Sequence, residues 1–112
     1  MPAGYVNIKI ESGATFSIDM ELNNADGSNL DLTGYTGACK IRKSYYSTFN
    51  VYPLTVTVVN PPTDGKIILS ATSTETAGFK PGRYVYDVEI TSGSSVIRVV
   101  EGIAEVMPNA TR

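Results

Sequence analysis

Residues 80–90 (KPGRYVYDVEI) decide the fold, because a turn built on proline and glycine leads directly into a long alternating strand. Gly82, Tyr84 and Tyr86 follow one another at intervals of two. This is the spacing of a tyrosine corner, in which a tyrosine hydroxyl near the start of a late strand bonds to backbone upstream. The feature is typical of immunoglobulin-like sandwiches. It predicts an architecture and carries no catalytic chemistry.

Apolar and polar residues alternate with a period of two along most of the chain. The clearest example is residues 15–22 (TFSIDMEL), where one face is apolar and the other polar, as in a half-buried antiparallel strand. Segments rich in Asn, Asp, Gly and Pro separate the alternating runs and indicate turns. We therefore expect strands over residues 5–10, 16–22, 36–43, 52–59, 66–71, 83–91 and 96–107.

These strands predict an all-β fold, an immunoglobulin-like β-sandwich of about seven antiparallel strands, in a single domain over residues 1–112. Thr72 and Glu75 have the spacing of a capping box, which predicts one helical turn over Ser73–Ala77. In the last strand the inward parity slips near Glu101 and Gly102, and a β-bulge is the simplest explanation there.

Composition excludes several classes of function. The chain has no His, which argues against Ser-His-Asp and Cys-His nucleophiles and the usual zinc sites. The sequence contains no glycine-rich phosphate loop, and the net charge of −2 argues against nucleic acid or an anionic membrane as the main partner. Cys39 is the single cysteine and is expected to be buried. We expect no enzymatic activity, no cofactor and no metal.

One turn has the composition of a calcium loop, with oxygen-bearing side chains at Asn24, Asp26, Ser28, Asn29 and Asp31. The order of these residues does not match an EF-hand, and the bidentate Glu at the end is missing. Ordinary turn chemistry explains the same residues.

A loop rich in aromatic residues is the candidate interaction site. Tyr and Arg are favoured in protein interfaces because they bury much area and keep a polar group. The same rings could instead close the end of the core, or form a platform for a glycan. The candidate residues are Arg42, Lys43, Tyr45, Tyr46, Phe49 and Tyr52.

The order of short motifs along the chain resembles that of a known group of proteins. The motifs are GATFS at 13–17, LDLTGY at 30–35, KIRKS at 40–44, GKIILS at 65–70, PGRYVYD at 81–87 and VVEG at 99–102. The set is similar to small virion proteins of tailed bacteriophages, in particular the N-terminal domain of phage baseplate upper proteins. The resemblance covers about residues 5–112.

This resemblance implies an immunoglobulin-like module that serves as a structural or adaptor protein of the virion, in several symmetric copies. Its partners would be other phage virion proteins, and it would be assembled in the host cytoplasm. Tail, baseplate and neck are the expected places. The alternatives are a capsid decoration protein, and a glycan-binding or adhesion module that uses residues 45–52.

Overall fold

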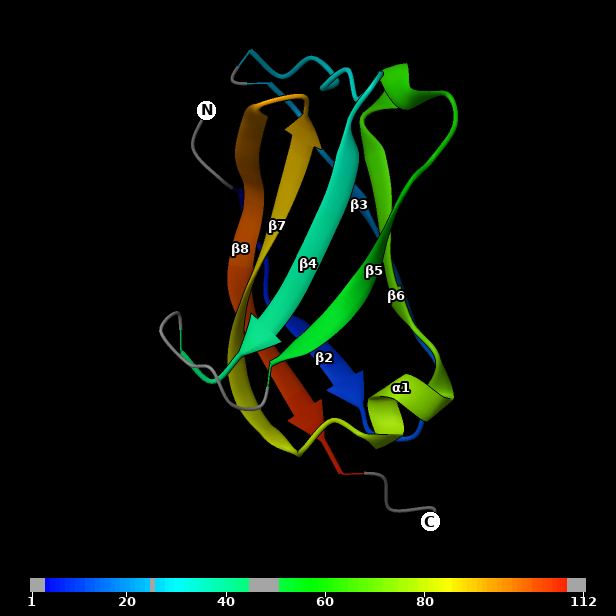
Figure 1. The fold of residues 1–112 in the computed structure, drawn as a ribbon, viewed down its shortest axis with the longest axis vertical. Helices are drawn as coiled ribbons and strands as arrows, with labels where there is room; N and C mark the ends of the chain where they lie inside the picture. The colour runs from blue at the N-terminus through cyan, green and yellow to red at the C-terminus, as the bar shows by residue number, and fades with distance from the viewer. Residues whose placement is uncertain (1–3, 25, 45–50, 109–112) are drawn as a thin grey trace.

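The computed structural model describes residues 4–24, 26–44 and 51–108. Strands dominate this part of the chain (Figure 1), with one short α-helix and one turn of 3₁₀ helix, η1 (Pro62–Asp64). The strands are β1 (Gly4–Tyr5), β2 (Ile8–Glu11), β3 (Phe16–Glu21), β4 (Thr36–Arg42), β5 (Tyr52–Val58), β6 (Lys66–Ala71), β7 (Gly82–Ser92) and β8 (Ser95–Met107). From β3 onward each strand lies within one residue of the bounds expected from the sequence.

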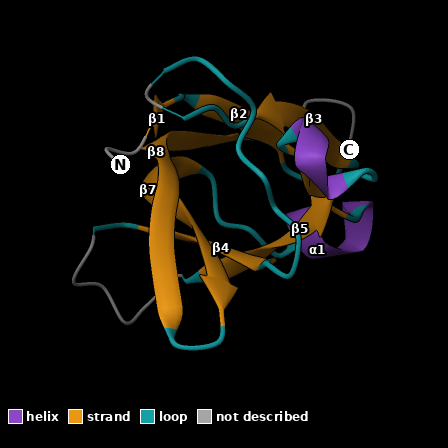
Figure 2. Ribbon diagram, turned by 90° about the horizontal axis from the view of Figure 1, so that it is seen from above, coloured by secondary structure: helices purple, strands orange, loops and turns teal. Residues whose placement is uncertain are grey.

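The strands form two layers that enclose the core, as the view from above shows (Figure 2). The order of neighbouring strands is β1-β8-β7-β4-β5-β6-β3, and β2 also pairs with β8. β5 belongs to both layers, since Tyr52–Leu54 pair with β4 and Thr55–Val58 pair with β6. The predicted all-β sandwich is confirmed, and the order of its neighbouring strands is immunoglobulin-like.

A glycine gives β5 room where it leaves β4. Gly37 lies opposite Val56 if the β4–β5 register is continued past Cys39 and Leu54. A Cβ atom on Gly37 would come within 2.4 Å of the Val56 Cγ1 atom. The valine side chain therefore occupies the space that a side chain at position 37 would need.

The buried faces follow the alternation in the sequence. On β3, Phe16 and Met20 are buried, whereas Ser17, Asp19 and Glu21 are exposed. On β7 the inward residues are fully buried and form the centre of the core. These inward residues are Tyr84, Tyr86, Val88 and Ile90.

The first strand differs from the expected antiparallel strand over residues 5–10. It is split into β1 and β2, and both run parallel to β8. At the break the Val6 N–H donates to the Glu101 carbonyl at 2.9 Å, and the Val6 carbonyl accepts from the Tyr86 hydroxyl. Asn7 bonds through its side chain to the Ile103 N–H at 3.2 Å. The side chains of Tyr86 and Asn7 thus supply two of the hydrogen bonds at the break, beside the backbone bond from Val6 to Glu101.

The predicted bulge near Glu101 and Gly102 is wrong in position. The register between β7 and β8 shifts after Val88, which lies opposite Val100, while Glu89 lies opposite Arg98. Val99 is thus the extra residue, and both Val99 and Val100 are buried. Because two adjacent valines are buried, the alternation of apolar and polar residues does not show where the register shifts.

The helix α1 (Ser73–Ala77) begins as the sequence predicts. Thr72 Oγ1 accepts from the Glu75 N–H at 3.1 Å, and Glu75 Oε1 accepts from the Thr72 N–H at 2.8 Å. This reciprocal pair is the capping box, and its prediction is confirmed.

Candidate interaction site

The turn before β7 places Tyr84 at one end of the sandwich. Its hydroxyl donates to the carbonyl oxygen of Lys80, four residues earlier. This is the contact that the expected tyrosine corner requires. Burial, and then the neighbouring Tyr52, raise the pKa of Tyr84 to about 12. The hydroxyl therefore stays protonated and keeps its bond at neutral pH.

Tyr86, two residues further along β7, makes a longer connection. Its hydroxyl donates to the Val6 carbonyl at 2.5 Å, so β7 is tied to the break between β1 and β2. Burial raises the pKa of the Tyr86 hydroxyl above its ordinary value. Position 86 is where antibody domains carry a disulfide cysteine. A hydrogen bond and ring packing hold the strands at that position here.

Tyr52 lies in an aromatic cluster beside the corner. Its ring stacks on Phe79, with centroids 4.7 Å apart and an interplanar angle of 23°. It meets Tyr84 edge-on at 5.7 Å, and its hydroxyl accepts from the Lys80 N–H at 3.2 Å. Tyr52, a candidate interface residue in the sequence, therefore helps to close this end of the core.

Lys43 packs over the corner from outside. Its Nζ atom lies 4.6 Å from the centroid of the Tyr84 ring and donates to the Arg83 carbonyl at 3.5 Å. A Cβ atom on Gly82 would come within 2.4 Å of that Nζ atom, so the missing side chain gives the lysine its place. A cation over an aromatic face is attracted to it, but weakly at such an exposed site.

The remaining candidate residues are placed only in part. Arg42 is half-buried at the end of β4. Tyr45, Tyr46 and Phe49 lie outside the described residues. The role of these six residues as an interface therefore stays a prediction.

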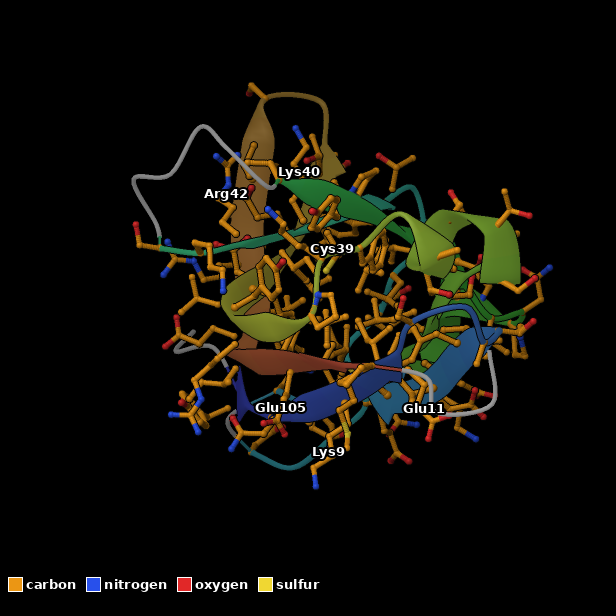
Figure 3. The ribbon with its side chains drawn as sticks, turned by 90° about the horizontal axis from the view of Figure 1, so that it is seen from below. Lys9, Glu11, Cys39, Lys40, Arg42 and Glu105 are labelled. Atoms are coloured by element: carbon orange, nitrogen blue, oxygen red, sulfur yellow. The ribbon has the colours of Figure 1, made fainter. Side chains whose placement is uncertain are left out.

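The outer face of the layer that contains β8, β7 and β4 carries mixed charges. Arg98 contacts Asp87 at 3.4 Å and Glu101 at 3.2 Å, with half of its side chain exposed. Figure 3 places Lys40 and Arg42 on β4, on the side of the molecule opposite to β2. Exposed ion pairs of this kind contribute little to stability and attract no single class of charged ligand.

The thiol is buried, and the polar turn is held by its own hydrogen bonds. Cys39 is buried in β4, and burial raises its pKa to about 12, so the thiol is protonated at neutral pH. In the turn, Asp26 accepts from the N–H and hydroxyl of Ser28 at 2.9 and 2.6 Å. Asn24 donates to the Ser28 hydroxyl at 3.1 Å. The bonds of Ser28 to Asp26 are those of an Asx turn. The described residues contain no cluster of three His, Cys, Asp or Glu side chains that could hold a metal.

Sequence reasoning missed two groups that hold this architecture. One is the Tyr86–Val6 bond, and the other is Thr76, which is fully buried on α1. Gly102 is the signal that could have indicated the first, because a Cβ atom there would lie 2.0 Å from the Val6 oxygen. Thr76 also contacts the Ser73 carbonyl within its own helix at 3.2 Å. Its partners outside the helix, Gly13 and Ala14, lie more than 60 residues away, and nothing local marks them.

Comparison with known proteins gives a likeness in fold. No protein-family model and no curated protein matches the chain. Among solved structures, the N-terminal domain of phage TP901-1 ORF48 matches with a TM-score of 0.59 and 12% identity, over 95% of this chain and 98% of that one. The fold expected from the resemblance to phage proteins thus occurs in a phage protein domain of the same extent.

Two further solved structures match more weakly. Listeria monocytogenes InlP has a TM-score of 0.46 and 17% identity, over 96% of this chain and 27% of that one. A family 123 glycoside hydrolase from Clostridium perfringens has a TM-score of 0.42 and 10% identity, over 95% and 23%. Neither score is high enough to carry a conclusion. Of the helices in the described ranges, none has the length and apolar character needed to cross a membrane.

Proposed function

We propose that the chain is a non-enzymatic structural or adaptor protein of a bacteriophage virion, and that it acts through protein–protein contacts. The observation that carries the proposal is the likeness to the N-terminal domain of phage TP901-1 ORF48, which spans nearly the whole of both chains. The order of motifs in the sequence supports the same class independently, because it resembles small tailed-phage virion proteins.

The buried polar groups fit a scaffold. Thr76, Tyr84 and Tyr86 each bond to backbone atoms from distant or preceding segments. Ser12, also buried, donates through its hydroxyl to the Thr76 carbonyl, and the buried Cys39 thiol is protonated at neutral pH. Side chains used in this way hold strands together. A catalytic site would instead need its polar side chains to be available to a substrate.

The proposed place is the tail, baseplate or neck, with several copies arranged by symmetry. Identical copies on a symmetric particle add up weak single contacts through avidity. A capsid decoration protein is the alternative within the same class, and it differs from the first in copy number.

Quantitative mass spectrometry of purified virus particles tests the proposal. We expect the chain to be present at about six to about eighteen copies per particle, as rotational symmetry of a tail or neck requires. A count in the hundreds would indicate the capsid. Absence from the particles, while the chain is made in infected cells, would overturn the virion role.

A glycan array separates this role from recognition of a host surface. We expect no saturable sugar binding. Saturable binding that is lost in Tyr45→Ala or Tyr46→Ala would contradict a purely structural role and would favour the glycan-binding alternative.

A further inference from the structure

The strand β3 has an open side. Within the described ranges it pairs only with β6. The Leu22 N–H donates to the Gly65 carbonyl at 2.6 Å, and this pair continues the register in which Met20 lies opposite Ile67. Antiparallel pairs alternate between bonded and non-bonded. Counting back from Leu22, the even-numbered residues of β3 therefore direct their backbone groups towards β6.

The odd-numbered residues direct theirs to the open side. They are Ser17, Asp19 and Glu21, each exposed. The pairing of β5 with β6 leads to the same assignment of which residues bond to which side, since the Val59 N–H donates to the Lys66 carbonyl at 3.0 Å. In that ladder Lys66 bonds to the β5 side, which leaves the next residue of β6 to bond to β3. β3 thus presents a regular row of backbone donors and acceptors.

A groove of about 470 Å³ lies along this edge, between β3 and the strands β1 and β8. Figure 2 shows β1, β2 and β3 on the same side of the molecule. Most of the residues that line the groove lack a polar side chain, and the rest are polar or charged. The residues without a polar side chain are Gly4, Val6, Met20, Leu22, Val99 and Val100. An extended segment bonded to β3 would direct every second side chain into this groove.

The other open edge is less suited to a new strand. β1 and β2 are separated by a break at Val6, whose N–H and carbonyl bond to Glu101 and Tyr86. Breaks of this kind are a common way to protect an edge from pairing. β3 is unbroken over Phe16–Glu21 and lacks that protection.

Charge decides what fits on β3. Asp19 and Glu21 are exposed, and both border the groove. A second copy that paired with β3 through its own β3 would bring carboxylates beside carboxylates, and like charges opposite each other are unfavourable. Lysine or arginine at the same positions would pair with both carboxylates.

We propose that the edge of β3 binds an extended segment of another protein, in which lysine or arginine alternates with small apolar residues. The segment adds a strand by β-augmentation, with its apolar residues beside Met20 and its basic residues opposite Asp19 and Glu21. This inference deepens the proposed function, and it depends on that function only for the partner being a virion protein.

The probe is a synthetic peptide, Lys-Val-Lys-Val-Lys-Val-Lys, added to the full chain and followed by amide NMR and hydrogen exchange. In the free protein, we expect the amides of Ser17, Asp19 and Glu21 to exchange much faster than those of Ile18 and Met20. With saturating peptide, the amides of Ser17, Asp19 and Glu21 become protected. A peptide methylated on alternate backbone nitrogens, which cannot form the ladder, is expected not to bind.

A charge-reversed pair of variants tests the choice of occupant. In Asp19→Lys with Glu21→Lys, affinity for the lysine peptide falls about tenfold, because two cross-strand attractions become repulsions. The same variant gains affinity for Glu-Val-Glu-Val-Glu-Val-Glu. The matched control, Glu11→Lys with Glu89→Lys, changes net charge equally at exposed positions off β3 and keeps its affinity for the lysine peptide.

Three outcomes overturn the inference. The first is the absence of new protection on β3, and the second is an equal loss of affinity in the control variant. The third is protection of Ser17, Asp19 and Glu21 that rises with protein concentration alongside a dimer in sedimentation, since a second copy would then occupy the edge. Mass spectrometry of particles is independent of the peptide, so failure of the edge and failure of the virion role are told apart.

Discussion

Tyr84 and Tyr86 sit two residues apart on one strand, yet their hydroxyls hold different parts of the molecule. Tyr84 bonds to Lys80 in the turn just before it, and Tyr86 bonds to Val6 at the break between β1 and β2. The first bond is local and follows from the spacing in the sequence. The second joins residues 80 positions apart, and only the fold brings them together.

Tyr84→Phe tests the local bond. We expect the free energy of unfolding to fall by about 1 kcal/mol or somewhat more, as for the loss of one buried hydrogen bond. Chemical denaturation of the purified chain measures it. Tyr35→Phe is the matched control, because the Tyr35 hydroxyl makes no hydrogen bond with the residues that the structure describes. Equal stability of the two variants would count against the corner.

Gly102→Ala tests the close approach at the break. The new Cβ atom would lie 2.0 Å from the Val6 oxygen, which is backbone and cannot rotate away. We expect a loss of about 1 to 3 kcal/mol, as for other insertions into a packed core. The midpoint of denaturation measures the loss.

Gly4→Ala is its control on the neighbouring strand. There the new Cβ atom meets the Val99 oxygen at 3.7 Å, an ordinary contact. If Gly102→Ala were as stable as Gly4→Ala, the break would not need a glycine beside it.

At the scale of elements, α1 is held to the turn between β2 and β3 by side-chain hydrogen bonds of Thr76 and Ser12. Thr76 Oγ1 donates to the Ala14 carbonyl at 2.8 Å and accepts from the Gly13 N–H at 3.1 Å. Thr76 is fully buried, and the Ser12 hydroxyl donates to its carbonyl at 3.3 Å. The helix is a single turn, so these bonds, more than its own length, keep it in place.

Thr76→Val keeps the shape of the side chain and removes its hydroxyl. We expect a loss of about 1 to 3 kcal/mol, because the Gly13 N–H and the Ala14 carbonyl lose a partner. Hydrogen exchange at the Gly13 amide should become faster in this variant, which a general loss of packing would not single out. Thr74→Val, at an exposed position of the same helix, is expected to change stability little. Unchanged exchange at Gly13 would argue against this anchoring.

The elements that the sequence predicts are those whose causes are local. The alternation of β3 and the capping box at Thr72 and Glu75 can be read within a few residues. The parallel pairing of β1 and β2 with β8 cannot, since it depends on contacts such as Ile8 with Ala104. The change of partner along β5 is hidden in the same way, because nothing in residues 52–58 marks where one pairing ends.

The candidate site shows the same division. The sequence indicates an aromatic cluster, and the structure places Tyr52 against Phe79 and Tyr84. The sequence does not indicate the open edge of β3, because an edge is defined by the absence of a neighbouring strand. The register and the hydrogen bonds of Leu22 and Val59 are needed to see which backbone groups face outward.

At the scale of the whole molecule, the core combines apolar packing with groups that can lose a proton. Burial raises the pKa of Cys39 from 9.0 and that of Tyr84 from 10.0, each to about 12. The pKa of Tyr86 is raised for the same reason. In each case the neutral form is favoured in the folded state, because the charged form would be taken out of water.

These raised pKa values make the free energy of unfolding depend on pH in the alkaline range. Well below pH 9.0 these groups are protonated in both states and contribute nothing to the dependence. Between 9.0 and about 12 the unfolded chain loses protons that the folded chain keeps. Stability therefore falls as pH rises through this window, since the unfolded state binds fewer protons.

Denaturation midpoints measured at neutral pH and at steps through the window check this expectation. In Cys39→Ala the decline should begin near pH 10.0, because the tyrosines then titrate first in the unfolded chain. The variant has its own lower baseline from the lost thiol, so the comparison concerns the pH of onset and not the midpoint itself. An unchanged onset would show that Cys39 is not the group that loses its proton first. A midpoint that stays level from 9.0 to about 12 would contradict the burial of all three protons, and with it the closed core on which the sandwich depends.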